Sequence, residues 1–366
     1  MFERRLYFHI DWLLLGAILL LAGIGVAMIY STTFDPVKQV PGPQFWTQLY
    51  ALVLGIFALL CCLMIDYRQL AEHSLVIYGL YLALLLYVLV FGVVRGGARR
   101  WIDLKVFNLQ PSEFGRLVVA LVLAMYFGEN RRGARTSADL MIGFGFTVLP
   151  LVLIAKQPDL GTAVVLLPVF LGVAYLAGMR MRLLAVITIV GALMAPVAWN
   201  YALKDYQKQR IETFVDPERD SRGAGYQQIQ ARITVGSGGL TGKGFMKGTQ
   251  GQYKFLPVAH NDFIFSVLAE EQGFIGVLVA LGLYLFIILR SLEAARLAKD
   301  RLGAYLVAGI ASGFTFQVIY NVTMSAGLAP VKGLTLPLLS YGGSAVIATL
   351  AGFGFILNVR MRRFTN

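Results

Sequence analysis

The chain has 366 residues, 57% of them hydrophobic and 14% charged, and its mean hydropathy is +0.68. Soluble domains carry about 25% charged residues and about 45–50% apolar ones, so this composition excludes an ordinary water-soluble protein. The net charge of +12 does not indicate a nucleic-acid partner, because most apolar residues stand in runs long enough to lie inside a membrane. Cys61 and Cys62 are the only cysteines and are adjacent, which excludes a disulfide framework and the spacing of a cysteine metal site.

Long apolar runs predict about ten membrane-spanning helices, each needing about 20 apolar residues to cross the hydrocarbon core. In chain order these runs are residues 12–30, 46–65, 74–94, 113–128, 140–155, 160–177, 183–200, 263–289, 303–326 and 342–359. The fifth and sixth are separated only by Lys156 to Asp159, so we expect a tight helical hairpin there. The alternating pattern of a membrane β-barrel does not occur in the sequence. The expected fold class is therefore an all-α integral membrane protein, built as a single transmembrane domain over residues 1–366.

The distribution of basic residues predicts the orientation in the membrane. Arg4 and Arg5 precede the first run, which is too long for a signal peptide and lacks a following small-x-small cleavage site. We therefore interpret it as an uncleaved helix. With the N-terminus inside, the short inner segments carry about twice as many Lys and Arg as the short outer ones, as the positive-inside rule requires. Both termini are then cytoplasmic, and residues 201–262 form one long extracytoplasmic loop.

Charged residues inside the predicted spans need a partner or a function, because each costs about 2.5–3.5 kcal/mol at the centre of a helix. Glu113 and Arg116 are three positions apart at the start of the fourth span, on one helix face where they can pair. Mutual neutralisation is the structural alternative to a role in a site. Glu270 and Glu271 stand about two turns into the eighth span, so at least one is expected to face the interior of the bundle.

Two aspartates stand at the expected starts of helices. Asp159 follows Pro158 before the sixth span, and Asp262 opens the eighth span shortly after His260. Each can be a helix cap, which needs only an acceptor oxygen, or a carboxylate of a functional site. Together with Glu113 and the many outer cations, they offer a general base and groups that stabilise a departing phosphate. These residues alone do not distinguish an enzyme from a transporter.

The outer loop is basic, and it is rich in glycine between Gly223 and Gly251. Residues 238–244 resemble a phosphate-binding P-loop, but Ser237 stands where that motif begins with glycine and Gly244 replaces its Ser or Thr. We therefore infer no ATP site. The stretch either presents ammonium, guanidinium and backbone N–H groups to a phosphate, or it lets a solvated loop turn sharply against the membrane.

Short motifs recur over almost the whole chain. They are residues 97–102 (GARRWI), 110–113 (QPSE), 157–162 (QPDLGT), 223–226 (GAGY), 236–240 (GSGGL), 247–250 (KGTQ), 260–265 (HNDFIF) and 336–344 (LPLLSYGGS). In this order and together, they resemble the SEDS family (shape, elongation, division, sporulation). The form of residues 247–250 and the absence of long terminal tails are most similar to the elongation-type branch and not to the division-type branch.

The resemblance implies a peptidoglycan glycosyltransferase that polymerises lipid II at the outer face of the bacterial cytoplasmic (inner) membrane, for cell elongation and rod shape. It implies as partners a class B penicillin-binding protein, which is a transpeptidase that cross-links the product, and other proteins of the elongation machinery. In the family, the aspartate matching Asp262 is the catalytic residue. The same cavity holds the positions matching Arg100, Trp101, Glu113, Arg116 and Asp159.

The sequence departs from the family pattern at two positions. Arg116 stands where the family commonly has Lys, and a guanidinium that is always charged argues against proton transfer there. Val258 follows Leu256 and Pro257 where the family commonly has Glu, so a supporting role for that glutamate does not carry over.

The expected reaction joins the sugar of one lipid-linked disaccharide to a hydroxyl of another. Asp262 would be the general base for the attacking hydroxyl, as the base of an inverting glycosidase is for water, and His260 would bind substrate beside it. A transporter that flips lipid II or another isoprenoid diphosphate is the main alternative, and a non-catalytic scaffold for a cell-wall synthase is a third. A transporter predicts ionisable residues along a whole transmembrane path.

The remaining substrate-binding residues are expected to divide by charge. Arg100, Arg116 and Lys243 would stabilise the departing diphosphate. Glu113 and Asp159 would hold those cations or a divalent ion, Mg²⁺ or Mn²⁺. The sequence has no dedicated metal-ligand motif, so no cofactor is certain.

Overall fold

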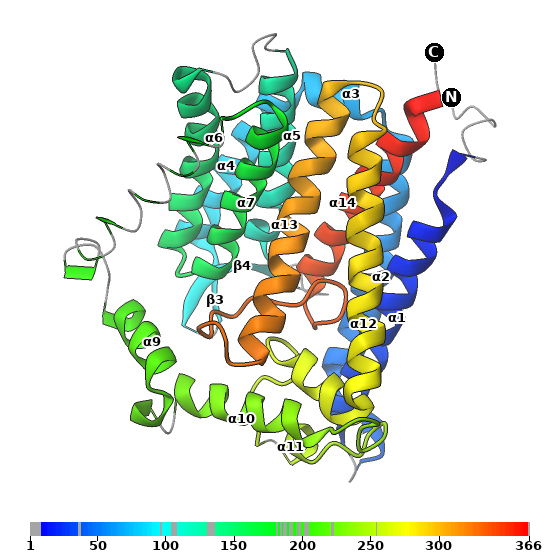
Figure 1. Ribbon diagram of the computed structural model, residues 1–366, viewed down its shortest axis with the longest axis vertical. Helices are drawn as coiled ribbons and strands as arrows, with labels where there is room; N and C mark the ends of the chain where they lie inside the picture. Colours follow the sequence, from blue (N-terminus) through cyan, green and yellow to red (C-terminus); the bar gives the residue numbers. More distant parts are fainter. Residues whose placement is uncertain are drawn as a thin grey trace.

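The apolar runs fold into a bundle of long helices (Figure 1). The computed structural model describes residues 9–364 except 36–37, 96, 104–107, 130–135, 181, 184, 186–188, 190–192, 195, 197–198, 201–204, 221–222 and 254. Eight of the described helices are long and apolar enough to span a membrane, and α7 is a shorter apolar helix. The seventh predicted span, residues 183–200, lies largely outside the described residues.

The helices that match the other predicted spans begin and end within a few residues of the expected positions, except that α12 continues to Arg296, beyond its predicted end at residue 289. They are α1 (Trp12–Thr33), α2 (Pro43–Met64), α4 (Ser74–Phe91), α5 (Gly115–Glu129), α6 (Ser137–Lys156), α7 (Leu160–Leu176), α12 (Ile264–Arg296), α13 (Arg301–Ser325) and α14 (Gly343–Met361). Several begin at a capping side chain, and Asp11 of α1 and Asp300 of α13 each accept a backbone N–H three residues on. The all-α membrane fold predicted from the sequence is confirmed.

The most buried helices occupy the centre of the bundle. α14 is buried along most of its length and packs against α2 and α13, and α13 also packs against α5, α7 and α12. α2, α4 and α6 lie at the periphery and expose large apolar side chains such as Phe57, Phe91 and Met141. Such a surface is stable only against lipid, where the helices satisfy their own backbone hydrogen bonds.

Short antiparallel strands extend from the ends of two helices. β1 (Phe34–Asp35) pairs with β2 (Val40–Pro41) between α1 and α2. β3 (Val93–Arg95), β4 (Ala98–Asp103) and β5 (Asn108–Leu109) follow α4 in the order β3-β4-β5. This small sheet leads into η2 (Pro111–Phe114), a single turn of 3₁₀ helix that continues directly into α5.

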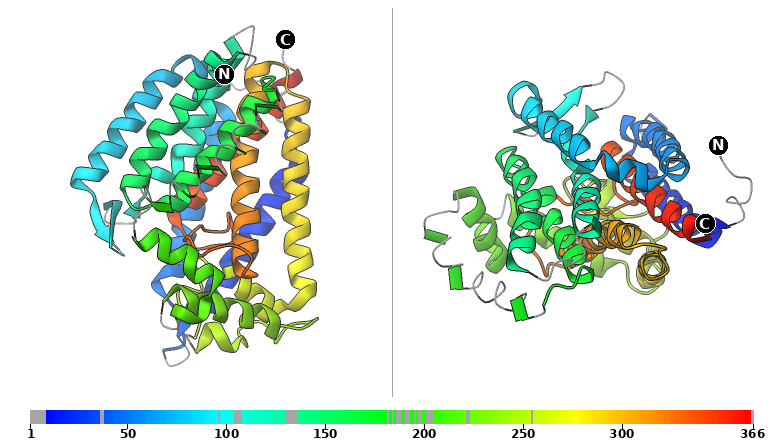
Figure 2. Two further views of the ribbon diagram at one scale, coloured as in Figure 1. Left: turned by 60° about the vertical axis from the view of Figure 1, so that its left-hand side comes forward. Right: turned by 90° about the horizontal axis from the view of Figure 1, so that it is seen from above.

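The segment predicted as a long outer loop contains helices. α9 (Asp205–Val215), η3 (Pro217–Asp220), α10 (Ala224–Ser237) and α11 (Thr249–Gln252) lie across one end of the bundle (Figures 1 and 2). We call this the outer end, following the predicted topology. α1 begins and α14 ends at the opposite, inner end, as an even number of spans requires.

Helix α12 is broken at Gly273, whose φ of 65° lies in the left-handed region. The glycine-rich stretch fills the break. The N–H groups of Lys243 and Gly244 donate to the carbonyls of Glu270 and Glu271, both at 2.9 Å. The N–H groups on the other side of the break, those of Phe274 and Ile275, donate to residues 239 and 240 at 2.9 and 3.1 Å.

This close backbone pairing explains the glycines. A Cβ on Gly238 would lie 1.9 Å from the Ala269 carbonyl oxygen, and one on Gly242 would lie 2.2 Å from that of Glu271. The backbone amides of Lys243 and Gly244 are therefore not available to a phosphate. The sequence left two explanations for the glycines open, phosphate binding and a sharp turn of the loop. The structure favours the second kind, because the glycines allow the loop to pack closely, here against the break in α12.

Candidate active site

Asp159 organises a buried polar cluster at the outer end. It is the N-cap of α7, where its Oδ1 accepts the N–H of Thr162 at 3.3 Å. Its Oδ2 accepts from Gln110 Nε2 at 2.6 Å and from Ser112 Oγ at 3.1 Å, and Arg100 approaches Oδ1 at 3.6 Å. The two roles considered for Asp159 are thus combined, because one oxygen caps the helix while both face polar groups of the cluster.

Strand β4 presents Arg100 to this cluster and places Trp101 beside it. The guanidinium carbon of Arg100 lies 5.8 Å from the centroid of the Trp101 ring, within the range of a cation–π contact. The Arg100 side chain keeps 29% of its surface exposed, whereas that of Asp159 keeps 4%. Arg100 therefore reaches from a buried carboxylate toward the solvent-accessible side of the cluster.

Arg116 is fixed by neutral partners and not by Glu113. It is 4% exposed, and its guanidinium donates to Gln317 Oε1 on α13 and, on α14, to Thr349 Oγ1 at 2.6 Å and the Ala345 carbonyl at 3.3 Å. Within the described part of the chain, Glu113 forms no ion pair and its buried Oε2 has no hydrogen-bond partner. The two charges still interact electrostatically, but the direct contact expected from their spacing is not formed.

Asp262 lies in a turn that precedes α12. α12 begins at Ile264 with Phe263 at the N-cap position and no side-chain cap, so Asp262 does not occupy the capping position that the sequence left open. Asn321 on α13 holds this turn by donating to the carbonyl oxygens of Asp262 and Leu334 at 2.9 and 2.6 Å. The Asp262 carboxylate adjoins Gly333, where a Cβ would lie 3.5 Å from Oδ2.

His260 is anchored in the same turn. Its carbonyl accepts the N–H of Tyr341 at 2.9 Å, and the two rings meet edge to face with centroids 5.6 Å apart. Burial lowers the pKa of His260 below its ordinary value, so the imidazole is neutral at pH 7. A neutral ring can exchange hydrogen bonds with a sugar, but it does not add a cation for a diphosphate.

Two elements bring Asp262 and the Asp159 cluster to one place. Gln317, which holds Arg116, and Asn321, which holds the Asp262 turn, are four residues apart and so lie on one face of α13. Gly161, in the first turn of α7, packs against the Lys332 carbonyl, from which a Cβ would be only 2.9 Å away. The segment 332–334 thus lies between the start of α7 and the carboxylate of Asp262.

Lys243 lies in a different environment from the other predicted site residues. Its Nζ is 2.6 Å from Oε1 of Glu270, which is fully buried and also accepts the N–H groups of Thr249 and Gln250. Glu271 is buried too and accepts a hydrogen bond from Ser31. Both glutamates face the interior, and this arrangement gives Lys243 a structural partner; among the described residues, its ion pair is with Glu270 and not with the Asp159 cluster.

Sequence reasoning missed several polar partners of the site: Gln110, Ser112, Gln317, Asn321 and Thr349. Gln317 and Asn321 carried a usable signal, because neutral amides four residues apart inside an apolar span also require partners. Thr349 carried less signal, since a threonine inside a helix commonly bonds its own backbone.

A divalent cation has few free ligands in this cluster. Among the residues that the structure describes, no group of three or more His, Cys, Asp and Glu side chains could hold a metal ion. Both oxygens of Asp159 already accept hydrogen bonds, which leaves Glu113 Oε2 as the available carboxylate oxygen. A requirement for Mg²⁺ or Mn²⁺ therefore stays a prediction.

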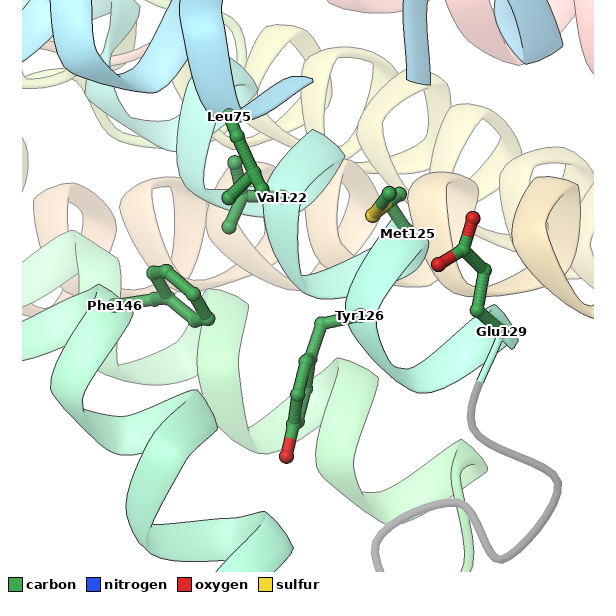
Figure 3. Close-up of a pocket in the computed structure, with 6 residues that line it drawn as sticks. All are labelled: Leu75, Val122, Met125, Tyr126, Glu129 and Phe146. Atoms are coloured by element: carbon green, nitrogen blue, oxygen red, sulfur yellow. The ribbon is translucent and has the colours of Figure 1, made fainter. Parts of the chain in front are cut away.

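A separate cavity of about 400 Å³ lies near the inner end of α5 (Figure 3). It is lined by Leu75, Val122, Met125, Tyr126, Glu129 and Phe146. The lining is mostly apolar, and Glu129 is its one charged residue. This cavity lies at the other end of α5 from Glu113 and Arg116, so it is not part of the candidate active site.

Comparisons with known proteins agree over nearly the whole chain. A family model described as "Cell cycle protein", which joins FtsW, RodA and SpoVE, matches residues 11–364. The peptidoglycan glycosyltransferase MrdB of Escherichia coli (strain K12) is 36% identical over 97% of this chain and 94% of its own length. The peptidoglycan glycosyltransferase RodA of Treponema pallidum (strain Nichols) is 30% identical over 96% of this chain and 98% of its own.

Solved structures show the same fold. A chain from a structure described as the coordination of polymerization and crosslinking by a peptidoglycan synthase complex has a TM-score of 0.84 and 34% identity. It covers 98% of this chain and 99% of its own. The rod shape determining protein RodA of Thermus thermophilus has a TM-score of 0.72 and 31% identity, with 98% of each chain covered. Family model, relatives and fold together establish that the chain belongs to the SEDS family and is a multi-pass protein of the bacterial inner membrane.

Proposed function

We propose that this protein is a peptidoglycan glycosyltransferase that polymerises lipid II at the outer face of the membrane during cell elongation. The observation that carries the proposal is that Asp262 lies near the cluster of Arg100, Arg116 and Asp159 at one end of the bundle. Segment 332–334 and one face of α13 connect the two. The names of the relatives support the same activity.

The reaction forms one glycosidic bond and breaks one bond to phosphate. The C4 hydroxyl of one lipid-linked disaccharide attacks C1 of the sugar of another, and Asp262 takes the hydroxyl proton. The bond between C1 and the diphosphate oxygen breaks with inversion, and undecaprenyl diphosphate leaves. Asp262 suits the role of base because its carboxylate adjoins Gly333 of segment 332–334, in a turn held by Asn321.

The two arginines of the site have different roles in this proposal. Arg100 is partly exposed, and its Nε has no partner among the described residues, so it is able to bind an oxygen of the departing diphosphate. Arg116 is buried and held by α13 and α14, so it acts as a fixed positive charge that stabilises negative charge in the cavity. Trp101 beside Arg100 offers an apolar face to the lipid-linked sugar.

A lipid II flippase is the second candidate, and the placement of buried charges argues against it. In the described part of the chain, Glu113, Arg116 and Asp159 lie at the outer end, and Asp11 and Arg360 pair at the inner end at 3.1 Å. Glu270 and Glu271 are covered by the outer glycine-rich stretch. A transport path would require ionisable groups between these two ends.

The proposal includes a partner. A class B penicillin-binding protein would cross-link the strands that this protein makes, and the structural relative from a complex coordinating polymerization and crosslinking supports such a pairing. Other proteins of the elongation machinery are proposed on the resemblance alone.

Purified protein mixed with labelled lipid II in detergent tests the proposal. An enzyme makes glycan polymer without a membrane, whereas a flippase or a scaffold does not. The reaction should be run with and without a class B penicillin-binding protein, and with Asp262→Asn as the negative control. Absence of polymer from the wild type under both conditions would overturn the proposed activity.

A further inference from the structure

Tyr81 on α4 has a buried hydroxyl without a partner. The side chain is 5% exposed, and among the described residues its Oη forms no hydrogen bond. Leaving such a group unpaired costs about 1–3 kcal/mol, which phenylalanine at the same position would avoid. The retained hydroxyl therefore suggests a partner that binds from outside the protein.

The position of the hydroxyl is fixed by Gly115. A Cβ on Gly115 would lie 2.4 Å from Tyr81 Oη, so the hydroxyl packs directly against the backbone between Glu113 and Arg116. Glu113 stands two residues before Gly115, and Ser112, one residue earlier, donates to Asp159 at 3.1 Å. Tyr81 thus belongs to the candidate active site, although it comes from a helix that carries none of the predicted site residues.

A second unpartnered atom belongs to a residue two positions before Gly115. Glu113 Oε2 is buried and has no hydrogen-bond partner among the described residues. The two groups are complementary, because the tyrosine offers an O–H donor and the carboxylate offers an acceptor. A hydroxyl group satisfies both at once, since it accepts one hydrogen bond and donates another.

We propose that Tyr81 and Glu113 together bind one hydroxyl group of the lipid-linked sugar, which accepts from Tyr81 Oη and donates to Glu113 Oε2. This inference rests on the proposed function and adds Tyr81 to the substrate-binding residues of that site. A bound water has the same chemistry, and the experiment below separates the two sources.

The chain provides a matched control on the same helix. Tyr78, one turn earlier, donates its hydroxyl to the carbonyl of Phe146 at 2.9 Å. Tyr78→Phe therefore removes an internal hydrogen bond, whereas Tyr81→Phe removes a hydroxyl that has none. The same chemical change should lower the melting temperature at position 78 and leave it unchanged or raised at position 81.

Gly115→Ala tests the geometry independently. The added methyl group would displace the Tyr81 hydroxyl 2.4 Å away, but the ring carbon that carries it is 3.3 Å away and needs only a small shift. Gly115→Ala should therefore reproduce the effect of Tyr81→Phe on substrate binding. In the Tyr81→Phe background it should add little, because the colliding atom is gone.

The decisive measurement is KM for lipid II, with kcat and melting temperature, for purified wild type, Tyr81→Phe, Tyr78→Phe, Gly115→Ala and Tyr81→Phe/Gly115→Ala. We expect KM to rise about 3–10-fold in Tyr81→Phe, as loss of one hydrogen bond predicts, and to be unchanged in Tyr78→Phe. A wild-type KM for Tyr81→Phe overturns the inference, and an unchanged KM with a lower melting temperature assigns the hydroxyl to a bound water. If wild type makes no polymer, the proposed function fails instead, and direct binding of labelled lipid II to the same variants still tests Tyr81.

Discussion

Asp262 and Asp159 are both aspartates, but their structural surroundings differ. Asp159 accepts four polar contacts and caps α7, whereas Asp262 lies in a turn outside the N-cap position of α12, with its carboxylate beside Gly333. Asparagine can replace a carboxylate that only accepts hydrogen bonds, but it cannot take a proton.

We therefore predict that Asp262→Asn folds normally and loses polymerisation. Melting temperature and partner binding should stay near wild type, and the rate of glycan synthesis should fall by at least about 10²-fold, as expected for loss of a general base. Purified variant assayed on labelled lipid II gives the rate, and a thermal melt gives the stability. Near-normal polymer from Asp262→Asn would remove the catalytic assignment.

Glu113 and Arg116 should depend on each other without touching. Arg116→Met leaves Gln317 and Thr349 without their donor and Glu113 without its compensating charge, so we expect a loss of roughly 3–5 kcal/mol in stability. Glu113→Gln removes the charge that Arg116 compensates. The double change should cost less than the two single changes added together.

A double-mutant cycle on melting temperature and on polymerisation rate measures this coupling. Fully additive losses would show that the two residues act independently. A loss of folded protein at unchanged specific activity would assign both to stability alone.

At the residue level, the sequence located the buried charged residues but not their partners. Glu113, Arg116 and Asp159 are costly in a membrane wherever they point, so their interior position could be predicted. The contacts of Arg116 come from α13 and α14, about 200 residues further along the chain, and no local pattern specifies which neutral side chains will face it. Tyr81 was missed because a tyrosine in an apolar span looks like an ordinary core residue.

At the level of elements, the break in α12 gives Lys243 a structural role. The glycine-rich stretch supplies hydrogen bonds to both sides of Gly273, and the Lys243–Glu270 ion pair ties that stretch to the first half of the helix. Removing Lys243 leaves the fully buried Glu270 carboxylate without its counter-charge, which costs more than the pair contributes.

We predict that Lys243→Met lowers stability by roughly 3–5 kcal/mol and that adding Glu270→Gln restores much of it. If Lys243 instead binds the departing diphosphate, the single variant should keep its stability and lose activity. Thermal melts and polymerisation rates of the two single variants and the double variant decide between these roles. Failure of Glu270→Gln to rescue Lys243→Met would contradict the structural assignment.

The break itself could not be read from the sequence. Residues 263–289 form one largely apolar run, and each of its three glycines (Gly273, Gly276 and Gly282) is compatible with a continuous helix. The hydrogen bonds lost at the break are replaced by backbone groups of residues 239–244. Backbone groups are the same in every residue, so the side chains do not reveal this pairing. The glycines could be seen in the sequence, but their purpose could not. Close packing of two backbone segments requires glycine for the same steric reason as a phosphate-binding loop does.

For the whole molecule, hydropathy was sufficient to predict the architecture. In lipid each span must satisfy its own backbone hydrogen bonds, so a long apolar run has few alternatives to a helix. The small β3-β4-β5 sheet and the helices α9 to α11 lie outside the spans, where this constraint does not act. From the sequence, residues 201–262 were predicted only as a loop, and no strand was predicted.

The orientation of the bundle gives the last prediction. The structure places the start of α1 and the end of α14 at one end and η3 at the other, and the excess of basic residues on the short inner segments predicts that the first end is cytoplasmic. With Cys61 and Cys62 changed to Ser, a cysteine introduced by Glu218→Cys, at an exposed position of η3, should react with an impermeant maleimide in intact cells. The matched variant Glu72→Cys, at an exposed position of α3 (Tyr67–Glu72) near the inner end, should react only after lysis. The reverse labelling pattern would place α9 to α11 and the Asp262 site in the cytoplasm, where lipid-linked sugars facing outward could not reach them.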